Sequence, residues 1–464
     1  MTVWTRARVL VLVAVVWMTA TTLAIGRAPD DPALMPNMLA FPNEAGSTRT
    51  FSVDGAIDLS NPFFQSLGSN GRACVTCHQP SDGWSVTPEH IQARFDASGG
   101  RDPIFRTNDG SNSPHADVST VEARRAAYSM LLTKGLIRVG IGVPDNAEFE
   151  LVGVDDPYGF ASAAELSLFR RPLPSTNLRF LSAVMWDGRE TFPGETMQFN
   201  LSDQANGAAL GHAAATQPLS PEQRDAIVRF ESGLYTAQND DRLVGELRNH
   251  GASGGSIPLS GQPFFIGIND VLGAGFNPRA FTTFDAWKDA PPIPSPRPAR
   301  DPRPADEARK SIARGQEIFN TRAFDITGVN GVNDVLDVTA LPGTCTTCHD
   351  TPNVGNHSTS LPLDLGLTTE ARRTPDMPLY TFRNKATGQI VKTTDPGRAL
   401  ITGRWKDMSL FKGPILRALS ARAPYFHNGA AATLQDVVDF YDTRFALHLT
   451  PRDKADLVAF LKAL

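Results

Sequence analysis

Every cysteine of the chain belongs to one of two pentapeptides with the same pattern. Cys74-Val75-Thr76-Cys77-His78 and Cys345-Thr346-Thr347-Cys348-His349 both read CxxCH, and together they use all 4 cysteines. CxxCH is the attachment sequence of c-type haem, in which the two thiols bond to the haem and the histidine binds its iron. A disulfide within each pair, or one zinc site built from all four thiols, would leave both histidines unexplained. We therefore expect two covalently bound haems c, held by Cys74, Cys77 and His78 and by Cys345, Cys348 and His349.

The N-terminus predicts export from the cytoplasm. Arg6 and Arg8 precede the apolar run Val9–Ile25, so residues 1–28 have the pattern of a secretory signal peptide or of an N-terminal membrane anchor. Haem attachment through CxxCH takes place outside the bacterial cytoplasm, and the absence of other cysteines suits an oxidising compartment. We expect a periplasmic protein. Its net charge of −5 lacks the basic character of a nucleic-acid-binding protein.

The chain has 464 residues, which is long enough for two or three domains. A proline-rich segment divides it into two parts. Residues 291–304, PPIPSPRPARDPRP, predict an extended linker because proline cannot donate a backbone hydrogen bond. The division gives an N-terminal haem domain over 29–290 and a C-terminal cytochrome c domain over 305–464. The expected fold class is mainly α, with two cytochrome c-like haem domains, the first enlarged by insertions, and minor β-hairpins.

Capping residues and apolar spacing predict several helices. Capping boxes at Ser220–Gln223 and Thr450–Asp453 mark two helix starts, and apolar spacing predicts a helix near Val121–Lys134. From Asp30 to about Thr50 the chain is polar and should be irregular. After the linker, one helical face should carry Ala308, Ile312, Gly315 and Phe319, with the glycine allowing another helix to approach closely.

Four further motifs follow a fixed order. Trp186-Asp187-Gly188-Arg189 and Asp203-Gln204-Ala205 lie between the two CxxCH motifs, and FKGPILR (411–417) and PYFHNG (424–429) follow the second. In order and rough spacing they resemble the WDGR, distal Gln-Ala, FKxPxLR and PYxHxG motifs of the bacterial dihaem cytochrome c peroxidase/MauG superfamily. Each motif alone is weak, but four in order with two CxxCH motifs are specific.

The resemblance implies roles for two residues of the WDGR motif. Peroxide reduction takes two electrons at one site, so the second haem would store an electron and Trp186 would relay it between the haems. The alternative for Trp186 is a plain core residue. Arg189 would anchor a haem propionate through a bidentate pair, and its alternative is an ordinary surface salt bridge.

The sixth ligand of the C-terminal haem distinguishes branches of the family. The position fourteen residues after the histidine of PYxHxG holds Met in the peroxidases and Tyr in MauG-like members, and here it is Tyr441. A phenolate stabilises higher oxidation states of iron, whereas a thioether raises the potential. The resemblance therefore favours the Tyr-ligated, MauG-like branch. The alternatives are that Tyr441 only packs against Phe440, or that Met408 or Met377 is the ligand.

The distal pocket of the first haem departs from the family. A Glu commonly stands ten residues after the pocket Gln204, and this position is Ala214. Cleavage of the peroxide O–O bond needs a group that moves a proton between the oxygens, and the imidazole of the nearby His212 is a side chain of the kind that can shuttle a proton. We take His212 as the substitute acid–base group; the alternatives are a distal iron ligand or a structural histidine. His90 and His115 are further candidates for a distal ligand.

Two other expectations concern calcium and His357. Family members often bind Ca²⁺ between the domains, partly through an Asn before WDGR. The stretch 171–177 lacks that Asn at the aligned position, and Arg422 replaces a small polar residue, which argues against calcium. For His357, soon after the second CxxCH motif, we expect a structural role or a propionate contact.

These features predict a dihaem peroxidase-like oxidoreductase. It would reduce H2O2 at the His78 haem, with electrons relayed through Trp186 from the His349/Tyr441 haem. The donor would be a small cytochrome c or cupredoxin, or a protein substrate oxidised at long range as in MauG. The alternatives are a non-catalytic electron-transfer cytochrome, favoured by the missing Glu at position 214, and a haem oxygenase, which needs an apolar channel. The sequence does not decide whether the chain forms a homodimer, as many peroxidases do.

Overall fold

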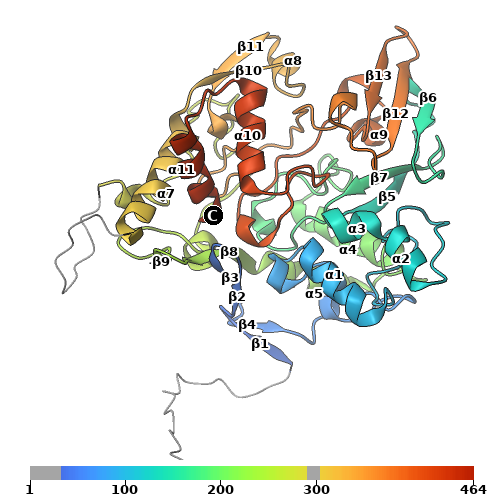
Figure 1. Cartoon of the computed structure of the whole chain (residues 1–464), viewed down its shortest axis with the longest axis horizontal. Coiled ribbons are helices and arrows are strands. Elements are labelled where there is room, and N and C mark those ends of the chain that lie inside the picture. Colours follow the sequence, from blue (N-terminus) through green and yellow to red (C-terminus); the bar gives the residue numbers. More distant parts are fainter. Residues whose placement is uncertain (1–32, 290–303) are drawn as a thin grey trace, which may run out of the picture.

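The computed structural model describes residues 33–289 and 304–464, with eleven α-helices among them (Figure 1). The predicted signal peptide or anchor, and the linker up to residue 303, lie outside this part. Across the described ranges no helix has the length and apolar character needed to cross a bilayer. The helices are α1 Pro88–Ser98, α2 Val121–Ala127, α3 Ser129–Lys134, α4 Met197–Gly211, α5 Pro221–Ser232, α6 Ser256–Ser260, α7 Pro304–Thr321, α8 Asn333–Leu336, α9 Ala399–Thr402, α10 Leu434–Phe445 and α11 Pro451–Lys462.

The strands form five small antiparallel sheets, the largest in the order β2-β3-β8-β9. Helix accounts for 32% and strand for 17% of the structure, so helix exceeds strand, while the two separate haem domains stay a prediction. Some strands that follow each other in the sequence pair as hairpins. The pairs β3–β8 and β6–β12, in contrast, join strands that lie far apart in the sequence. The strands are β1 Leu34–Pro36, β2 Ala40–Pro42, β3 Gly46–Ser52, β4 Ala56–Asp58, β5 Ile137–Ile141, β6 Phe149–Asp155, β7 Leu166–Arg170, β8 Leu234–Asp241, β9 Gly245–Glu246, β10 Phe324–Thr327, β11 Ala340–Gly343, β12 Leu379–Asn384 and β13 Ile390–Thr393.

The helices predicted from capping boxes are confirmed. Ser220 and Thr450 each accept a hydrogen bond from the third backbone N–H of α5 and α11. Helix α7 packs against α11, and a Cβ added at Gly315 would clash with the carbonyl oxygen of Asp456. Only glycine allows this approach. The two helices therefore cross closely, as the sequence predicts.

Two local predictions are wrong. The segment Val121–Lys134 is broken at Tyr128, whose ψ of 19° ends α2 before α3 begins. The residues from Asp30 to about Thr50 include strands rather than irregular chain, because β3 hydrogen-bonds to β8. There the buried hydroxyls of Thr50 and Thr236 lie 2.9 Å apart, so polar side chains are satisfied inside the sheet.

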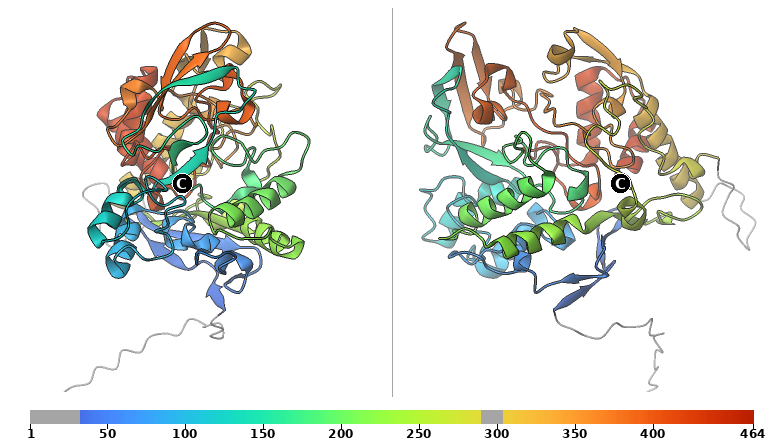
Figure 2. Two further views of the ribbon diagram at one scale, coloured as in Figure 1. Left: turned by 90° about the vertical axis from the view of Figure 1, so that its right-hand side faces the viewer. Right: turned by 180° about the vertical axis from the view of Figure 1, so that it is seen from behind.

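The described residues before and after the linker pack together. Phe281, Phe284 and Trp287 share one hydrophobic cluster with α7, α10 and α11. The backbone of β8 reaches the C-terminus, where Gln238 N–H donates to the carbonyl of Leu464 at 3.2 Å. The predicted domain boundary stays a prediction. Seen from behind in Figure 2, α4 and α5, drawn in green, lie side by side.

Candidate functional site

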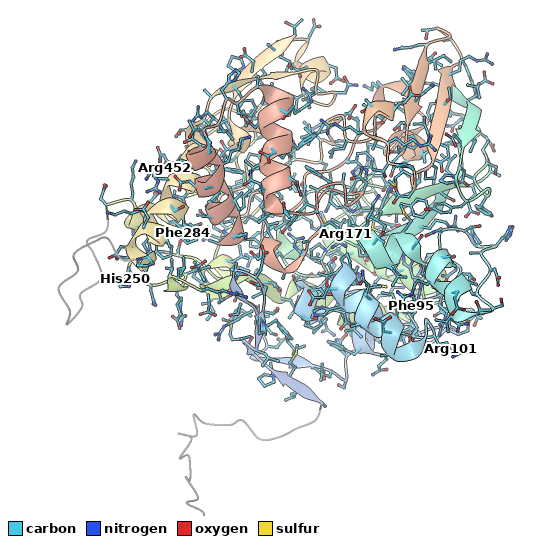
Figure 3. The ribbon with its side chains drawn as sticks, in the orientation of Figure 1. Phe95, Arg101, Arg171, His250, Phe284 and Arg452 are labelled. Atoms are coloured by element: carbon cyan, nitrogen blue, oxygen red, sulfur yellow. The ribbon has the colours of Figure 1, made fainter. Side chains whose placement is uncertain are left out.

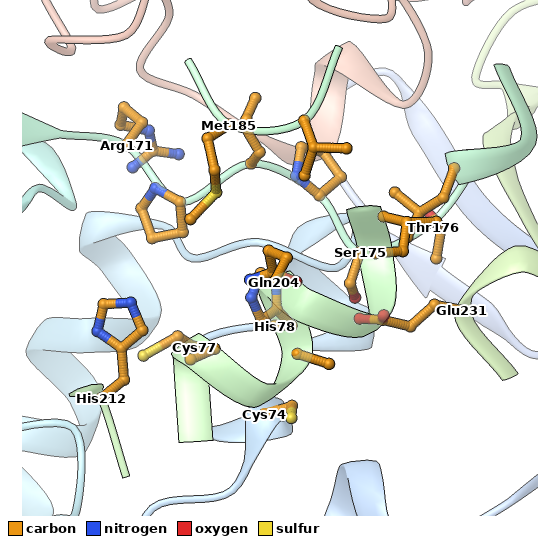
Figure 4. A pocket seen from close by; sticks show the side chains of 18 of the residues that line it. Cys74, Cys77, His78, Arg171, Ser175, Thr176, Met185, Gln204, His212 and Glu231 are labelled. Carbon is orange, nitrogen blue, oxygen red and sulfur yellow. The ribbon is translucent and has the colours of Figure 1, made fainter. Parts of the chain in front are cut away.

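The first CxxCH motif lines a cavity between α4 and the segment before Trp186 (Figure 4). Cys74 and Cys77 lie on a 3₁₀ turn, Cys74–Thr76, and both thiols are free. His78 Nδ1 lies 3.1 Å from the carbonyl oxygen of Trp84. Because a carbonyl only accepts, Nδ1 carries the proton and Nε2 keeps a lone pair that is available to a metal ion. Burial lowers the pKa of His78 to about 4, which keeps the ring neutral.

The second CxxCH motif lines a separate cavity in the same manner. Cys345 and Cys348 are free thiols at the turn Cys345–Thr347. His349 Nδ1 lies 2.7 Å from the carbonyl oxygen of Gly355, and burial lowers the pKa of the ring. Each cavity therefore offers two thiols and one neutral imidazole whose Nε2 is available. This donor set fits a covalently bound haem.

Trp186 lines both cavities. Its Nε1 donates to the carbonyl oxygen of Arg171 at 2.8 Å, and the backbone N–H of Arg171 donates to the carbonyl of His427 at 2.6 Å. The Trp186 ring lies 6.1 Å from the His427 ring. These contacts fix the indole in the wall between the cavities.

Gln204 and His212 line the first cavity and not the second, and Figure 4 shows them around it with His78. Gln204 is on α4, and His212 follows its last residue. His212 Nδ1 hydrogen-bonds to the Asp109 carboxylate, which also pairs with Arg72. Burial raises the pKa of Asp109, but His212 and Arg72 outweigh it and lower the pKa overall. The ionised Asp109 holds the proton on Nδ1 and leaves Nε2 of His212 as the reactive nitrogen.

Arg189 also lines the first cavity, but its guanidinium faces a carboxylate of the chain. Arg189 Nη1 lies 3.0 and 3.2 Å from the two carboxylate oxygens of Asp187. Asp187 is fully buried and also pairs with Arg170; although burial raises its pKa, the two arginines lower it to about 2. The role predicted for Arg189 at a propionate stays a prediction.

Tyr441, Met408 and Met377 are the three candidates for the sixth ligand of the C-terminal haem. Of these three, Tyr441 alone lines the second cavity. It lies on α10 among Phe426, Phe440 and Phe445, and burial raises the pKa of its hydroxyl. Met408 and Met377 are buried in other clusters, away from both cavities.

The remaining predicted histidines lie elsewhere. His90 pairs with Asp82 and His115 packs against Phe160, and neither lines a cavity. Both ring nitrogens of buried His357 are engaged, Nδ1 with Asp350 at 3.0 Å and Nε2 with Thr359 at 3.0 Å. This agrees with a structural role. The described ranges contain no group of three or more His, Cys, Asp or Glu that could hold a metal ion, and calcium stays untested because carbonyls would supply part of its site.

Several residues of the cavities were missed by sequence reasoning. Glu231 is a buried acid of α5 in the first cavity, and burial raises its pKa to about 8. Glu231 stands four residues after Ile227 and therefore lies on the same buried helix face. A charged residue within this apolar stripe was the sequence signal that could have identified it. Met185 lines the same cavity beside Trp186. Near the wall lie four cations whose position the sequence did not indicate, although Lys412 and Arg417 belong to the FKGPILR motif: Arg171, Lys412, Arg417 and Arg422.

Comparison with known proteins finds peroxidases. Similar proteins include cytochrome-c peroxidase IdrP2 of Denitromonas iodatirespirans (35% identical over 145 residues, 28% of this chain and 38% of that protein) and cytochrome-c peroxidase IdrP1 of Pseudomonas sp. strain SCT (31% over 163 residues, 29% and 42%). Cytochrome c551 peroxidase of Nitrosomonas europaea is 32% identical over 126 residues, 26% of this chain and 30% of that protein. The matches span less than half the length of these relatives. No protein-family model matches the sequence.

Two solved structures have low similarity. A MauG-like protein associated with microbial copper homeostasis is 17% identical, with 66% of this chain and 76% of that chain covered and a TM-score of 0.34. Hydrazine synthase of Kuenenia stuttgartiensis is 16% identical, with 82% and 93% covered and a TM-score of 0.30. Both scores are too low to support an argument. In its two CxxCH motifs, its four ordered motifs and its local similarity to curated cytochrome-c peroxidases, the chain is similar to the bacterial dihaem cytochrome c peroxidase/MauG superfamily.

Proposed function

We propose that this chain is a periplasmic dihaem peroxidase-like oxidoreductase that reduces H2O2 at the first cavity with electrons from the second. The observation that carries the proposal is the position of Trp186, which lines both CxxCH cavities, while Gln204 and His212 line only the first. Bound haem c supplies the redox-active iron. Cys74, Cys77 and His78 would hold one haem, and Cys345, Cys348, His349 and Tyr441 the other.

His212 would move the protons of the reaction. Reduction of H2O2 to two waters consumes two electrons and two protons, and breaking the O–O bond needs a proton moved from one oxygen to the other. Nε2 of His212 accepts that proton and returns it, because Asp109 keeps Nδ1 protonated and Arg72 keeps Asp109 ionised. The amide of Gln204 would orient the peroxide by hydrogen bonding.

Trp186 would carry the electrons between the cavities. Its indole is oriented by the hydrogen bond to the Arg171 carbonyl, which reduces reorganisation during transfer. Tyr441 would help His349 to hold the iron of the C-terminal haem. Burial raises the pKa of its hydroxyl, and the positive charge of a bound ferric iron would favour the phenolate.

A second candidate is a pure electron-transfer cytochrome. Met185, a thioether of the kind that closes the sixth position of cytochromes, lines the first cavity. With Met185 as ligand, the first iron would be closed to peroxide. This alternative is the direct competitor in the test.

The test records optical and EPR spectra of the haem-loaded protein before and after one equivalent of H2O2. We expect a resting high-spin signal that disappears within seconds, and turnover of H2O2 with reduced cytochrome c or cupredoxin. The Trp186→Phe variant should still lose the high-spin signal on addition of H2O2, but it should not turn over H2O2 with the donor. Persistence of the oxidised protein for minutes without a donor would favour oxidation of a protein substrate. Two low-spin irons that do not respond to peroxide would overturn the enzyme and leave the electron carrier.

A further inference from the structure

Four cationic side chains, three of them buried and Arg422 half-buried, lie around the wall that separates the two cavities. Arg171, Lys412 and Arg422 line both cavities, and Arg417 lines the first. Arg171, labelled in Figure 3, lies near the middle of the molecule. The exposed fractions of Arg417 and Arg171 are 3% and 5%. Positive charges at this depth need compensation, because burial without a counter-charge is costly.

None of the four has a carboxylate partner in the part of the chain that the structure describes. Their side chains donate only to backbone carbonyls: Arg171 to Val86 at 2.7 Å, Lys412 to Ala183 at 3.0 Å, Arg422 to Arg417 at 2.6 Å and Arg417 to Asn353. Nε and Nη1 of Arg417 are buried without any partner. The backbone carbonyls accept hydrogen bonds from these side chains, but they carry no negative charge that would balance the four cations.

Other buried arginines show the usual arrangement. Arg72 pairs with Asp109, Arg138 with Glu165, and Arg170 with Asp395 at 2.7 Å. Among the four wall cations the pKa is lowered by burial instead, to about 7 for Lys412 and about 9 for Arg417. The wall is therefore a cluster of charged donors that fits an anionic group.

We infer that Arg171, Lys412, Arg417 and Arg422 bind the propionates of the two haems. The inference rests on the proposed dihaem function. Each haem carries two propionates, so two haems bring four negative charges to four cations. Three of the four line both cavities, so the propionate edges of both haems would face one wall beside Trp186. Arg189, the residue first expected here, already faces Asp187.

The test compares Lys412→Met and Arg417→Gln in the haem-loaded protein with Arg138→Met, a buried arginine outside both cavities. Haem is labelled with ¹³C at the propionate carboxyls, and redox-difference infrared spectra are recorded together with the midpoint potentials from pH 6 to 8. We expect labelled carboxylate bands in the native protein. In the two wall variants a labelled protonated-carboxyl band should appear, the potential should fall, and it should become pH-dependent. Arg138→Met should match the native protein.

Lys412→Arg keeps the charge and should restore the native spectra, which separates charge from packing. Unchanged labelled bands and potentials in both wall variants, at full haem content, would overturn the inference. Haem content per chain is measured independently, and a single haem would overturn the inference through its premise. Two haems with native propionate bands but no reaction with peroxide would leave the inference standing and remove only the peroxidase proposal.

Discussion

The two cavities have the same proximal side and different distal sides. In both, CxxCH lies on a 3₁₀ turn and the histidine donates through Nδ1 to a backbone carbonyl. The first cavity then adds Gln204, His212 and Glu231, whereas the second adds Tyr441 within an aromatic and aliphatic lining. The same CxxCH motif thus stands in two environments: the first cavity contains titratable polar side chains, and the second contains a buried tyrosine among apolar side chains.

The surrounding helices produce this difference. Helix α4 presents small residues, Ala205 and Ala209, to the first cavity and leaves room for a small polar molecule. Helices α10 and α11 line the second cavity with apolar side chains such as Val438, Leu457 and Leu461. An apolar lining suits electron storage, while a lining that adds polar groups suits reaction with peroxide.

The largest effect should come from removing either attachment motif. Cys74→Ser/Cys77→Ser and Cys345→Ser/Cys348→Ser should each lose one of two haems, halving the covalent haem per chain. Peroxide turnover should fall to background in both, because one cavity supplies the reaction and the other the electrons. Pyridine haemochrome spectra and turnover assays measure the two quantities. Turnover that survives the second pair of substitutions would contradict the division between the cavities.

Substitution of His212 should have the next largest effect. His212→Ala should slow reaction with H2O2 by about 10²–10⁴-fold, the usual contribution of a general acid–base group. Asp109→Asn should give a smaller loss, since the imidazole remains but its tautomer is no longer held.

His90→Ala is the matched control, because His90 also pairs with a carboxylate, Asp82, but lines neither cavity. Stopped-flow rates that fall equally in His212→Ala and His90→Ala would remove the catalytic role of His212. A normal rate in His212→Ala would do so as well, and would leave Glu231 as the acid of the first cavity.

The parts that sequence predicted correctly depend on local patterns. CxxCH, the capping boxes and the Gly315 contact each involve a few neighbouring residues or one helix face. The pairing of β3 with β8 joins Thr50 to Thr236, and no local signal in a polar segment indicates such a partner. The Asp187–Arg189 contact is local, but the buried Arg170–Asp395 pair beside it is not. Lys412 and Arg417 stand in the FKGPILR motif, but the sequence did not indicate their burial, because burial depends on the assembled wall.

Exchange of Tyr441 should alter the second cavity alone. Tyr441→Met should raise the midpoint potential of the C-terminal haem, because a thioether favours the reduced iron relative to phenolate. Tyr425→Phe is the control: Tyr425 lines the same cavity, but its hydroxyl donates to the Leu419 carbonyl at 2.9 Å. Potentiometric titration followed at each haem measures the effect. An unchanged potential in Tyr441→Met would assign the sixth position to another residue.

The smallest effect should be a pH dependence of stability from the first cavity. Burial raises the pKa of Glu231 from 4.5 to about 8, so between these values the folded protein holds a proton that the unfolded chain has released. Stability should therefore fall as pH rises from 4.5 to 8, by up to about 1.4 kcal/mol per pH unit. Glu231→Gln should abolish this contribution, and urea unfolding of the haem-loaded protein at several pH values measures it.

Asp364 provides the comparison from the second cavity. Burial raises its pKa as well, but its carboxylate accepts the backbone N–H of Gly366 at 2.7 Å, which stabilises the charged form. Asp364→Asn should thus flatten the pH dependence less than Glu231→Gln. If the two substitutions flatten it equally, the buried neutral acid is not particular to the first cavity. An unaltered slope in Glu231→Gln would mean that Glu231 is ionised in the folded protein.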